Sequence, residues 1–394
     1  MRPTSVLMTV TGRDRPGITA SFFAVLAAHD VDVRDVEQVV IRDRLILTVL
    51  VDLRGDTASL RNSVTRAAGA LGMDCELAVN DDPGAARPSV WGGRIHVIML
   101  GHPLRAGAVG HVAQRIADSG GNIEMVTQLS AEPVAALELV VRTADPDALR
   151  SILIQAADDT GVDIAVEPAG LRRKAKRLVV LDVDSTLIRG EAIDALAERA
   201  GVADRVRTIT AAAMAGDLDF AASLRERVEL LAGVPEQVLA DVRDQLELTP
   251  GAATFVRTLR RLGYHVGVVS GGFTAVISRF IAELDLDFAA ANELEIVDGV
   301  LTGRVLGPVV DAAGKAEALS RFAEKFDVPL SQTVAVGDGA NDVAMLERAG
   351  LGIAFNAKAA LRAAADAAVN VPYLDSVLFV LGVTRDEIAE AASN

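Results

Sequence analysis

Two carboxylates, Asp182 and Asp184, directly follow an apolar run and are separated by a single residue. In a regular strand both side chains would point to the same face, where like charges repel unless a proton or a cation relieves them. A hard divalent cation with oxygen ligands suits such a pair, and Mg²⁺ is the one most used beside phosphate. We therefore expect a magnesium site at Asp182 and Asp184, with Asp338, at the end of another apolar run, as a third oxygen donor.

Donors for a phosphate group stand elsewhere in the chain. Ser270, Gly271 and Gly272 lie where a strand is expected to turn into a helix, and backbone N–H groups at a helix start favour anions. Lys315 adds a compact positive charge of the kind that binds phosphate. Each feature alone has an ordinary explanation as a turn or a solvated side chain, so only their combination indicates a phosphate site.

Four continuous apolar runs must position these side chains. Such runs are typical of parallel strands that are covered on both faces. They are LVVLDVDST from Leu178, HVGVVSGG from His265, TVAVGDG from Thr333 and LGIAF from Leu351. Helical segments separate them, which predicts a doubly wound α/β domain with its ligand beyond the carboxyl ends of the strands.

Two further segments of this half have their own patterns. Residues 292–306 read as a hairpin that turns near Asp298 and Gly299. The segment from Gly190 to about Pro250 is almost wholly helical in pattern and far longer than a usual crossover. We expect it to form a helical cap above the strand ends.

The four motifs in this order resemble those of the haloacid dehalogenase-like hydrolases: DVDST at Asp182–Thr186, then Ser270, Lys315 and GDGAND at Gly337–Asp342. The resemblance runs from about Leu178 to the C-terminus. It implies that Asp182 attacks phosphorus and forms an aspartyl-phosphate intermediate. It also implies that Asp184 protonates the leaving oxygen and then activates water, that Lys315 assists the chemistry and the phosphate, and that Asp342 orients the metal ligands.

The cap resembles that of phosphoserine phosphatases at Glu191, Met214, Phe220 and Arg227. The resemblance implies that Glu191 pairs with the substrate ammonium and Arg227 with its carboxylate. Met214 and Phe220 would exclude water, and Asn341 would hydrogen-bond the substrate or its phosphate. Without the resemblance, core packing would explain Met214 and Phe220, a helix dipole would explain Glu191, and a surface ion pair would explain Arg227.

The activity that the resemblance implies is hydrolysis of O-phospho-L-serine to L-serine and phosphate, the last step of serine biosynthesis. Two alternatives within the same fold are a phosphotransferase and a phosphatase for another small phosphorylated metabolite. An alternative from another class is an amino-acid-sensing regulatory protein with an inactive second half. The full set of Asp182, Asp184, Lys315 and Asp338 argues against that last alternative.

The first half of the chain contains two similar segments, Ser5–Leu53 and Arg94–Thr143, offset by about 90 residues. Each has an apolar strand, a loop with two glycines, an Ala-rich helix and a second strand. The expected order strand, helix, strand, strand, helix, strand gives a small α+β sandwich. Each copy resembles an ACT domain, through GRDRPGI at Gly12–Ile18 and, more loosely, GHPLRAG at Gly101–Gly107.

The ACT resemblance implies an amino acid effector, for which the product L-serine is the obvious candidate. Glycine loops would let the polar ends of an amino acid reach backbone N–H groups beside polar side chains. The residues expected there are Asp14, Gly17, Asp32, Gly107 and Asn122. ACT domains often bind ligands at shared interfaces, so we expect a homodimer; domains that only dimerise remain the alternative.

These patterns predict three domains: residues 1–82, residues 91–168 and residues 178–394, with the cap at about 190–250. The segment Asp81–Val90 has the composition of a linker. A basic run lies at Arg172–Arg177, before the third domain. We interpret it as a solvated linker, with a binding patch as the alternative.

Composition excludes several other classes of protein. The 394-residue chain has a formal net charge of −15, which disfavours nucleic acid and anionic membranes as partners. It has one cysteine, so no intrachain disulfide forms, and its five scattered histidines indicate no zinc site. No signal peptide and no spanning apolar run is apparent, so we expect a cytoplasmic protein.

Overall fold

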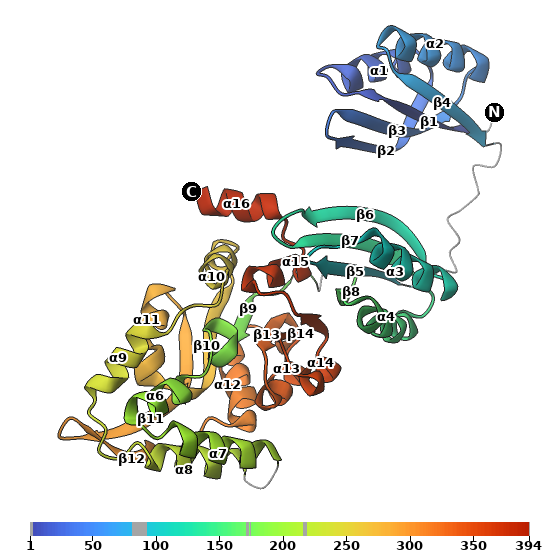
Figure 1. The fold of residues 1–394 in the computed structure, drawn as a ribbon. Helices are drawn as coiled ribbons and strands as arrows, with labels where there is room; N and C mark the ends of the chain where they lie inside the picture. The colour runs from blue at the N-terminus through green and yellow to red at the C-terminus, as the bar shows by residue number, and fades with distance from the viewer. Residues whose placement is uncertain (1–2, 81–92, 171–172, 174, 216–218, 394) are drawn as a thin grey trace. The chain divides into compact units, whose positions relative to one another are not determined.

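The computed structural model describes residues 3–80, 93–170, 173, 175–215 and 219–393 (Figure 1). The chain divides into two compact units, Met1–Val90 and Trp91–Asn394. The segment expected to be a linker, Asp81–Val90, lies outside the described residues. None of the helices in the described ranges is long and apolar enough to cross a membrane.

The first unit is an α+β sandwich with the expected order of elements. Its strands pair antiparallel in the order β2-β3-β1-β4, and two helices cover one face. The elements are β1 (Thr4–Arg13), α1 (Ile18–Leu26), β2 (Val31–Ile41), β3 (Arg44–Leu53), α2 (Thr57–Ala70) and β4 (Asp74–Asn80). Asp56 caps α2 by accepting hydrogen bonds from the backbone N–H groups of Ala58 and Ser59, which explains where this helix begins.

The second unit opens with the same arrangement, as expected for a duplicated domain. The elements are β5 (Arg94–Gly101), α3 (Ala106–Asp118), β6 (Asn122–Ser130), β7 (Ala135–Arg142), α4 (Pro146–Thr160) and β8 (Asp163–Pro168). Pro146 at its first position and Asp145 as its cap fix the start of α4, and Gly161 ends it with a left-handed backbone (φ 67°). The loop expected around Gly107 is shorter than predicted, because α3 already begins at Ala106.

The rest of the second unit is the expected α/β domain. Six strands lie parallel in the order β11-β10-β9-β13-β14-β15, and the central residues of β10, β9, β13 and β14 are buried. They are β9 (Leu178–Leu181), β10 (His265–Phe273), β11 (Phe288–Val297), β13 (Thr333–Gly337), β14 (Gly352–Phe355) and β15 (Ala367–Val369). All four apolar runs form strands of this sheet. The helices that pack with these strands are α10 (Ala252–Arg261), α11 (Thr274–Glu283), α12 (Ala312–Lys325), α13 (Val343–Arg348) and α14 (Ala359–Ala364).

The hairpin and the cap are also present. Strand β11 pairs antiparallel with β12 (Val300–Leu306) across Asp298 and Gly299, both of which have positive φ, as a tight hairpin turn requires. Among the described residues of the segment from Gly190 to Pro250, the chain forms the helices α6 (Ala192–Ala200), α7 (Ala203–Ala215), α8 (Phe220–Glu229) and α9 (Gln237–Gln245). They pack around their own apolar core together with Phe273, Leu294 and Leu301 of the α/β domain, which places the cap beside the strand ends.

The second small domain and the α/β domain are joined more closely than the sequence suggested. Strand β8 pairs with β15 through Ala165 and Ala367, so both sheets form one continuous sheet within the described residues. Ile98, Leu100 and Ala136 of the small domain share an apolar core with the C-terminal segment of the chain, which contains α15 (Val377–Val380) and α16 (Arg385–Ser393). The two domains therefore act as one structural unit.

Two residues of the basic run before β9, Arg173 and Lys176, are not solvated as we predicted. Among its described residues, Arg173 forms an ion pair with Glu138 (2.5 Å), and its side chain is 8% exposed. The Lys176 ammonium donates to the backbone carbonyls of Ser331 (3.1 Å) and Gly350 (2.8 Å), and Lys176 is buried. The prediction was wrong because a charge run in a sequence does not reveal which acceptors the fold places against it.

Candidate active site

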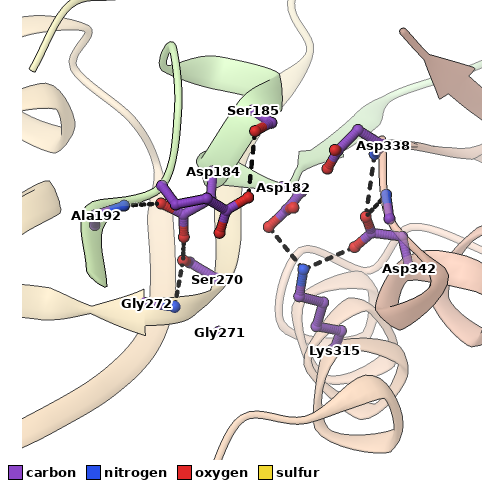
Figure 2. A network of polar contacts seen from close by, with 12 residues as sticks. Asp182, Asp184, Ser185, Ala192, Ser270, Gly271, Gly272, Lys315, Asp338 and Asp342 are labelled. Carbon is purple, nitrogen blue, oxygen red and sulfur yellow. Dashed lines mark hydrogen bonds and ion pairs between the residues drawn. The ribbon is translucent and has the colours of Figure 1, made fainter. Parts of the chain in front are cut away.

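The two carboxylates Asp182 and Asp184 do not lie in a regular strand, as their spacing suggested. Strand β9 ends at Leu181, and residues Val183–Leu187 form a single wide helical turn in which Ser185 has a positive φ of 57°. The backbone N–H of Asp182 still pairs with Val336 of β13 at 2.8 Å. Because the chain turns directly after Asp182, the two carboxylates point in different directions (Figure 2).

Lys315 reaches the strand ends from the first turn of α12. Its ammonium lies 2.7 Å from an oxygen of Asp182 and 2.7 Å from an oxygen of Asp342. The side chains of Lys315, Asp182 and Asp342 are 1%, 4% and 0% exposed, so water does not solvate these charges. The cap of α12 fixes this geometry, since Asp311 accepts from the N–H of Gly314 at 2.8 Å and turns the helix toward the site.

Three carboxylates gather beside Lys315. Oxygen atoms of Asp182, Asp338 and Asp342 lie within 4.8 Å of one another. Both oxygens of Asp342 are already engaged, one by Lys315 and the other by the backbone N–H groups of Asp338 and Gly339 (3.1 Å each). Asp342 therefore holds the cluster in shape, while Asp182 and Asp338 have oxygens that fit a hard cation.

Asp184 is not part of this group of described carboxylates, although we expected it to be the second carboxylate ligand. One of its oxygens accepts the backbone N–H of Ala192 at 2.7 Å, and the other accepts the hydroxyl of Ser270 at 3.3 Å. The Ser270 hydroxyl in turn accepts the N–H of Gly272 at 2.8 Å. The turn after Asp182 thus directs the Asp184 carboxylate toward the cap rather than toward Asp338.

The electrostatics of the cluster favour an additional positive charge. Burial, and then the charge of Asp342, raises the pKa of Asp182 well above its usual range. Burial likewise raises the pKa of Asp184, and burial together with Asp342 raises the pKa of Asp338 to about 6. For Lys315, burial lowers the pKa, but the charges of Asp182 and Asp342 outweigh it and the net pKa is raised. One ammonium among several carboxylates leaves a negative site that a divalent cation would neutralise.

A pocket of about 520 Å³ opens above these carboxylates, with the cap as its other wall. Phe220, at the start of α8, contacts the floor so closely that a Cβ on Gly271 would lie 2.8 Å from the tip of its ring. Glu191 and Arg227 line the same pocket. Burial, aided by Asp184 and Asp338, raises the pKa of Glu191 to about 7, while burial lowers the pKa of Arg227 against the opposing charge of Glu191.

Asn341 also lines the pocket, and Ser270 and Lys315 lie directly behind its floor. Met214 stands near the end of α7, but its side chain is outside the described part of the structure. The sequence did not single out three further polar lining residues: Asp194, Thr210 and Lys358. The hydroxyls of Thr210 and Ser223 are buried without a hydrogen-bond partner among the described residues, and no sequence motif signals such groups.

The residues expected to bind an effector are placed as follows. Gly17 caps α1 with a left-handed backbone (φ 91°), and the N–H of nearby Asp14 donates to the carbonyl of Asp43 at 2.7 Å. The carboxylate of Asp32 is paired with Arg54. Gly107 lies inside α3, and Asn122 begins β6. The role of these residues in binding an effector stays a prediction.

Comparison with protein families identifies each part of the chain. A haloacid dehalogenase-like hydrolase family matches residues 179–347. Two ACT domain families match residues 4–78 and residues 95–167. Both resemblances drawn from the sequence motifs are therefore confirmed.

Known relatives match almost the whole chain. Phosphoserine phosphatase SerB2 of Mycobacterium tuberculosis is 54% identical over 395 residues, covering 98% of this chain and 95% of the relative. A solved probable phosphoserine phosphatase from Vibrio cholerae is 35% identical, with a TM-score of 0.58. The match covers 76% of this chain and 88% of that chain. A solved phospho-aspartyl intermediate analogue of phosphoserine phosphatase is 43% identical, with a TM-score of 0.50, and covers 52% of this chain and 98% of that one. The chain belongs to the haloacid dehalogenase-like hydrolases, within their phosphoserine phosphatase family, and carries two ACT domains ahead of the catalytic domain.

Proposed function

We propose that the chain hydrolyses O-phospho-L-serine to L-serine and phosphate through an aspartyl-phosphate intermediate. One observation carries the proposal: a carboxylate held by a buried lysine, Asp182, lies in the same pocket as Glu191 and Arg227. Phosphoserine has a phosphate, an ammonium and a carboxylate. The pocket offers a nucleophile for the first, an anion for the second and a guanidinium fork for the third.

In the first step, an oxygen of Asp182 bonds to phosphorus while the bond from phosphorus to the serine oxygen breaks. Lys315 positions that carboxylate from behind, at 2.7 Å. The departing serine oxygen needs a proton, and Asp184 supplies it. Burial raises the pKa of Asp184, which favours its protonated form, and its hydrogen bonds to Ala192 and Ser270 hold the carboxyl group in place.

In the second step, Asp184, now ionised, takes a proton from water as that water attacks phosphorus. The bond between phosphorus and Asp182 breaks, which releases phosphate and restores the free carboxylate. Phe220, packed against Gly271 at the pocket floor, limits the entry of other water molecules. The solved phospho-aspartyl analogue of a related phosphoserine phosphatase supports this order of steps.

We infer that the resident cation is Mg²⁺, held by Asp182 and Asp338, with Asp342 orienting both. Oxygen donors and a phosphate substrate favour Mg²⁺ over softer metals. When bound, it would neutralise the carboxylates and the charge of the transferring phosphoryl group. L-Serine as an effector, assembly as a homodimer and a cytoplasmic location stay predictions; the ACT domains support the first of these.

The test is phosphate release from a panel of phosphorylated metabolites by the full chain, with Mg²⁺ and with EDTA, beside Asp182→Asn. We expect phosphoserine to have the highest kcat/KM, EDTA to abolish turnover, and Asp182→Asn to lose at least about a thousandfold in kcat. Preference for a sugar phosphate or for phosphothreonine would refute the substrate assignment. Undiminished turnover by Asp182→Asn would refute the nucleophile. New phosphoesters formed with added alcohols would favour the phosphotransferase alternative.

A further inference from the structure

The carboxyl ends of three neighbouring strands bring charged groups to the active-site pocket. Asp182 follows β9, Asp338 follows β13, and Lys358 lies shortly after the end of β14. These strands are adjacent and parallel, since β13 pairs with both β9 and β14. Their ends therefore lie side by side, where ligands of such sheets bind, and Lys358 is among the residues that line the pocket.

Hydrogen bonds hold the backbone of Lys358 next to Asp338. Asn356 has a positive φ of 46°, which turns the chain directly after β14, and its N–H donates to the carbonyl of Val369 at 2.8 Å. The N–H of Lys358 donates to the carbonyl of Asp338 at 3.4 Å. The carbonyl of Lys358 accepts the N–H of Arg362, in α14, at 3.2 Å. The Lys358 side chain therefore starts from a fixed point at the edge of the pocket.

The ammonium of Lys358 is not engaged by the part of the chain that the structure describes. Lys358 is exposed, and its side chain makes no hydrogen bond and no ion pair with the described residues. The other cationic groups at the pocket are engaged. Lys315 contacts Asp182 and Asp342 at 2.7 Å each (Figure 2). Arg227 is the proposed partner of the substrate carboxylate, so the charge of Lys358 is left for another group.

The charge of Lys358 acts on the side of the pocket where phosphate is expected. Burial, and then the charge of Asp342, raises the pKa of Asp338 to about 6. The positive charge of Lys358 opposes this rise, as does that of Lys315. The two lysines act from different sides, because Lys315 is buried behind the pocket floor whereas Lys358 is exposed on the pocket lining. Lys358 is therefore placed to meet a phosphoryl group from its solvent side.

We propose that Lys358 binds the phosphoryl group of the substrate, and afterwards the phosphate product, at the open side of the pocket. Its ammonium donates a hydrogen bond to a phosphoryl oxygen, and it takes part in no covalent bond and no proton transfer. A compact ammonium suits phosphate and offsets the repulsion between phosphate and the carboxylates of the pocket. This inference rests on the proposed function, because it assigns a further substrate-binding residue to that reaction. Unlike Arg227, Lys358 recognises the phosphate and not the rest of the substrate.

The experiment compares three phosphate esters as substrates of the full chain in Mg²⁺: phosphoserine, phosphoethanolamine and p-nitrophenyl phosphate. The phosphate is the only group that all three share, and phosphoserine alone has a carboxylate. Lys358→Gln should lower kcat/KM by about tenfold or more for all three, the loss of one charge-assisted hydrogen bond. Lys358→Arg, which keeps the positive charge, should retain most of the activity of the unmodified chain.

Arg362→Gln is the matched control. Arg362 is exposed on the same helix, α14, and has the same charge, but it is not among the described residues that line the active-site pocket. Its replacement should leave kcat/KM for the three esters unchanged. Equilibrium dialysis with inorganic phosphate in Mg²⁺ measures binding without turnover. The Kd for phosphate should rise about tenfold in Lys358→Gln and stay the same in Arg362→Gln.

Two results would overturn the proposal. One is a Kd for phosphate in Lys358→Gln that equals the Kd in Arg362→Gln. The other is a loss of kcat/KM confined to phosphoserine, which would place Lys358 at the substrate carboxylate instead. If phosphoserine is not a substrate, the proposed function fails, but the dialysis with phosphate still decides on Lys358 because it does not depend on the serine part of the substrate.

Discussion

Replacing Lys315 by methionine would leave two buried carboxylates without the ammonium that both contact. Each contact is 2.7 Å long, between side chains that are at most 4% exposed. At an effective dielectric constant of ~20, the Coulomb attraction across such a contact is about 6 kcal/mol, and desolvation of the three charges offsets much of it. Removing one partner of a buried pair costs about 3–5 kcal/mol, because the other charge stays buried. We expect a loss of that size in the free energy of unfolding at neutral pH.

The assay is urea unfolding of the full chain in EDTA, followed by circular dichroism, with Lys325→Met as the control. Lys325 lies on the same helix, α12, but is exposed and only stacks over Phe326. Its loss should cost about 1 kcal/mol or less. Mg²⁺ should restore more stability to Lys315→Met than it adds to the unmodified chain, since the cation would neutralise the carboxylates that the lysine leaves unpaired.

The dependence on pH gives the sign of the effect. A carboxyl group whose pKa is raised in the folded state binds more protons when folded. Its ionised form therefore lowers the free energy of unfolding most above that pKa, and this loss disappears as pH falls. The pKa of Asp182 is already raised by burial and by Asp342, and it would rise further without Lys315. The difference in the free energy of unfolding between Lys315→Met and the unmodified chain should therefore shrink from about pH 8 to about pH 5. A gap that stays constant with pH, or one no larger than that of Lys325→Met, would refute this account of the buried cluster.

Three further variants test the substrate pocket. Arg227→Ala should lower kcat/KM for phosphoserine by roughly 10- to 100-fold, but that for phosphoethanolamine, which lacks the carboxylate, far less; equal losses would remove Arg227 from recognition. The pKa of Glu191 is raised to about 7, so the ratio of kcat/KM for phosphoserine to kcat/KM for phosphoglycolate should fall as pH drops through that value. In Glu191→Gln this ratio should not depend on pH. Gly271→Ala should lower kcat/KM roughly tenfold through its clash with Phe220, and the effect should vanish in a Phe220→Ala background.

Much of the fold could be predicted because the responsible patterns are local. Continuous apolar runs gave β9, β10, β13 and β14, and the Asp298–Gly299 pair gave the hairpin turn. The duplicated order of strands and helices in the first half of the chain could be predicted in the same way. The direction of the Asp184 carboxylate could not be predicted, since the chain leaves the extended conformation directly after Asp182, which alternation along a strand does not anticipate.

Partners that are far apart in the sequence explain the other differences. Lys176 is buried because carbonyls of Ser331 and Gly350 meet it, more than 150 residues later in the chain. The same holds where β8 meets the end of β15, since Asp163 accepts a hydrogen bond from Asn370. Neither pairing leaves a signature in a single sequence, because its residues are ordinary for loops and strand ends. Contacts of this kind decide how the second ACT domain is attached to the catalytic domain.

The charges of the active-site pocket favour the binding of a cation. Five carboxylates line the described pocket (Asp182, Asp184, Glu191, Asp194 and Asp338) against two cationic side chains, Arg227 and Lys358. Lys315 behind the floor adds one more positive charge. Phosphoserine itself brings a net negative charge, so a pocket of protein groups alone would repel it. The proposed divalent cation at Asp182 and Asp338 would reverse that balance at the phosphate, while Glu191, ionised above its pKa of about 7, would pair with the ammonium. The carboxylates of the pocket thus favour a substrate that has a positive group at one end and a metal-binding phosphate at the other.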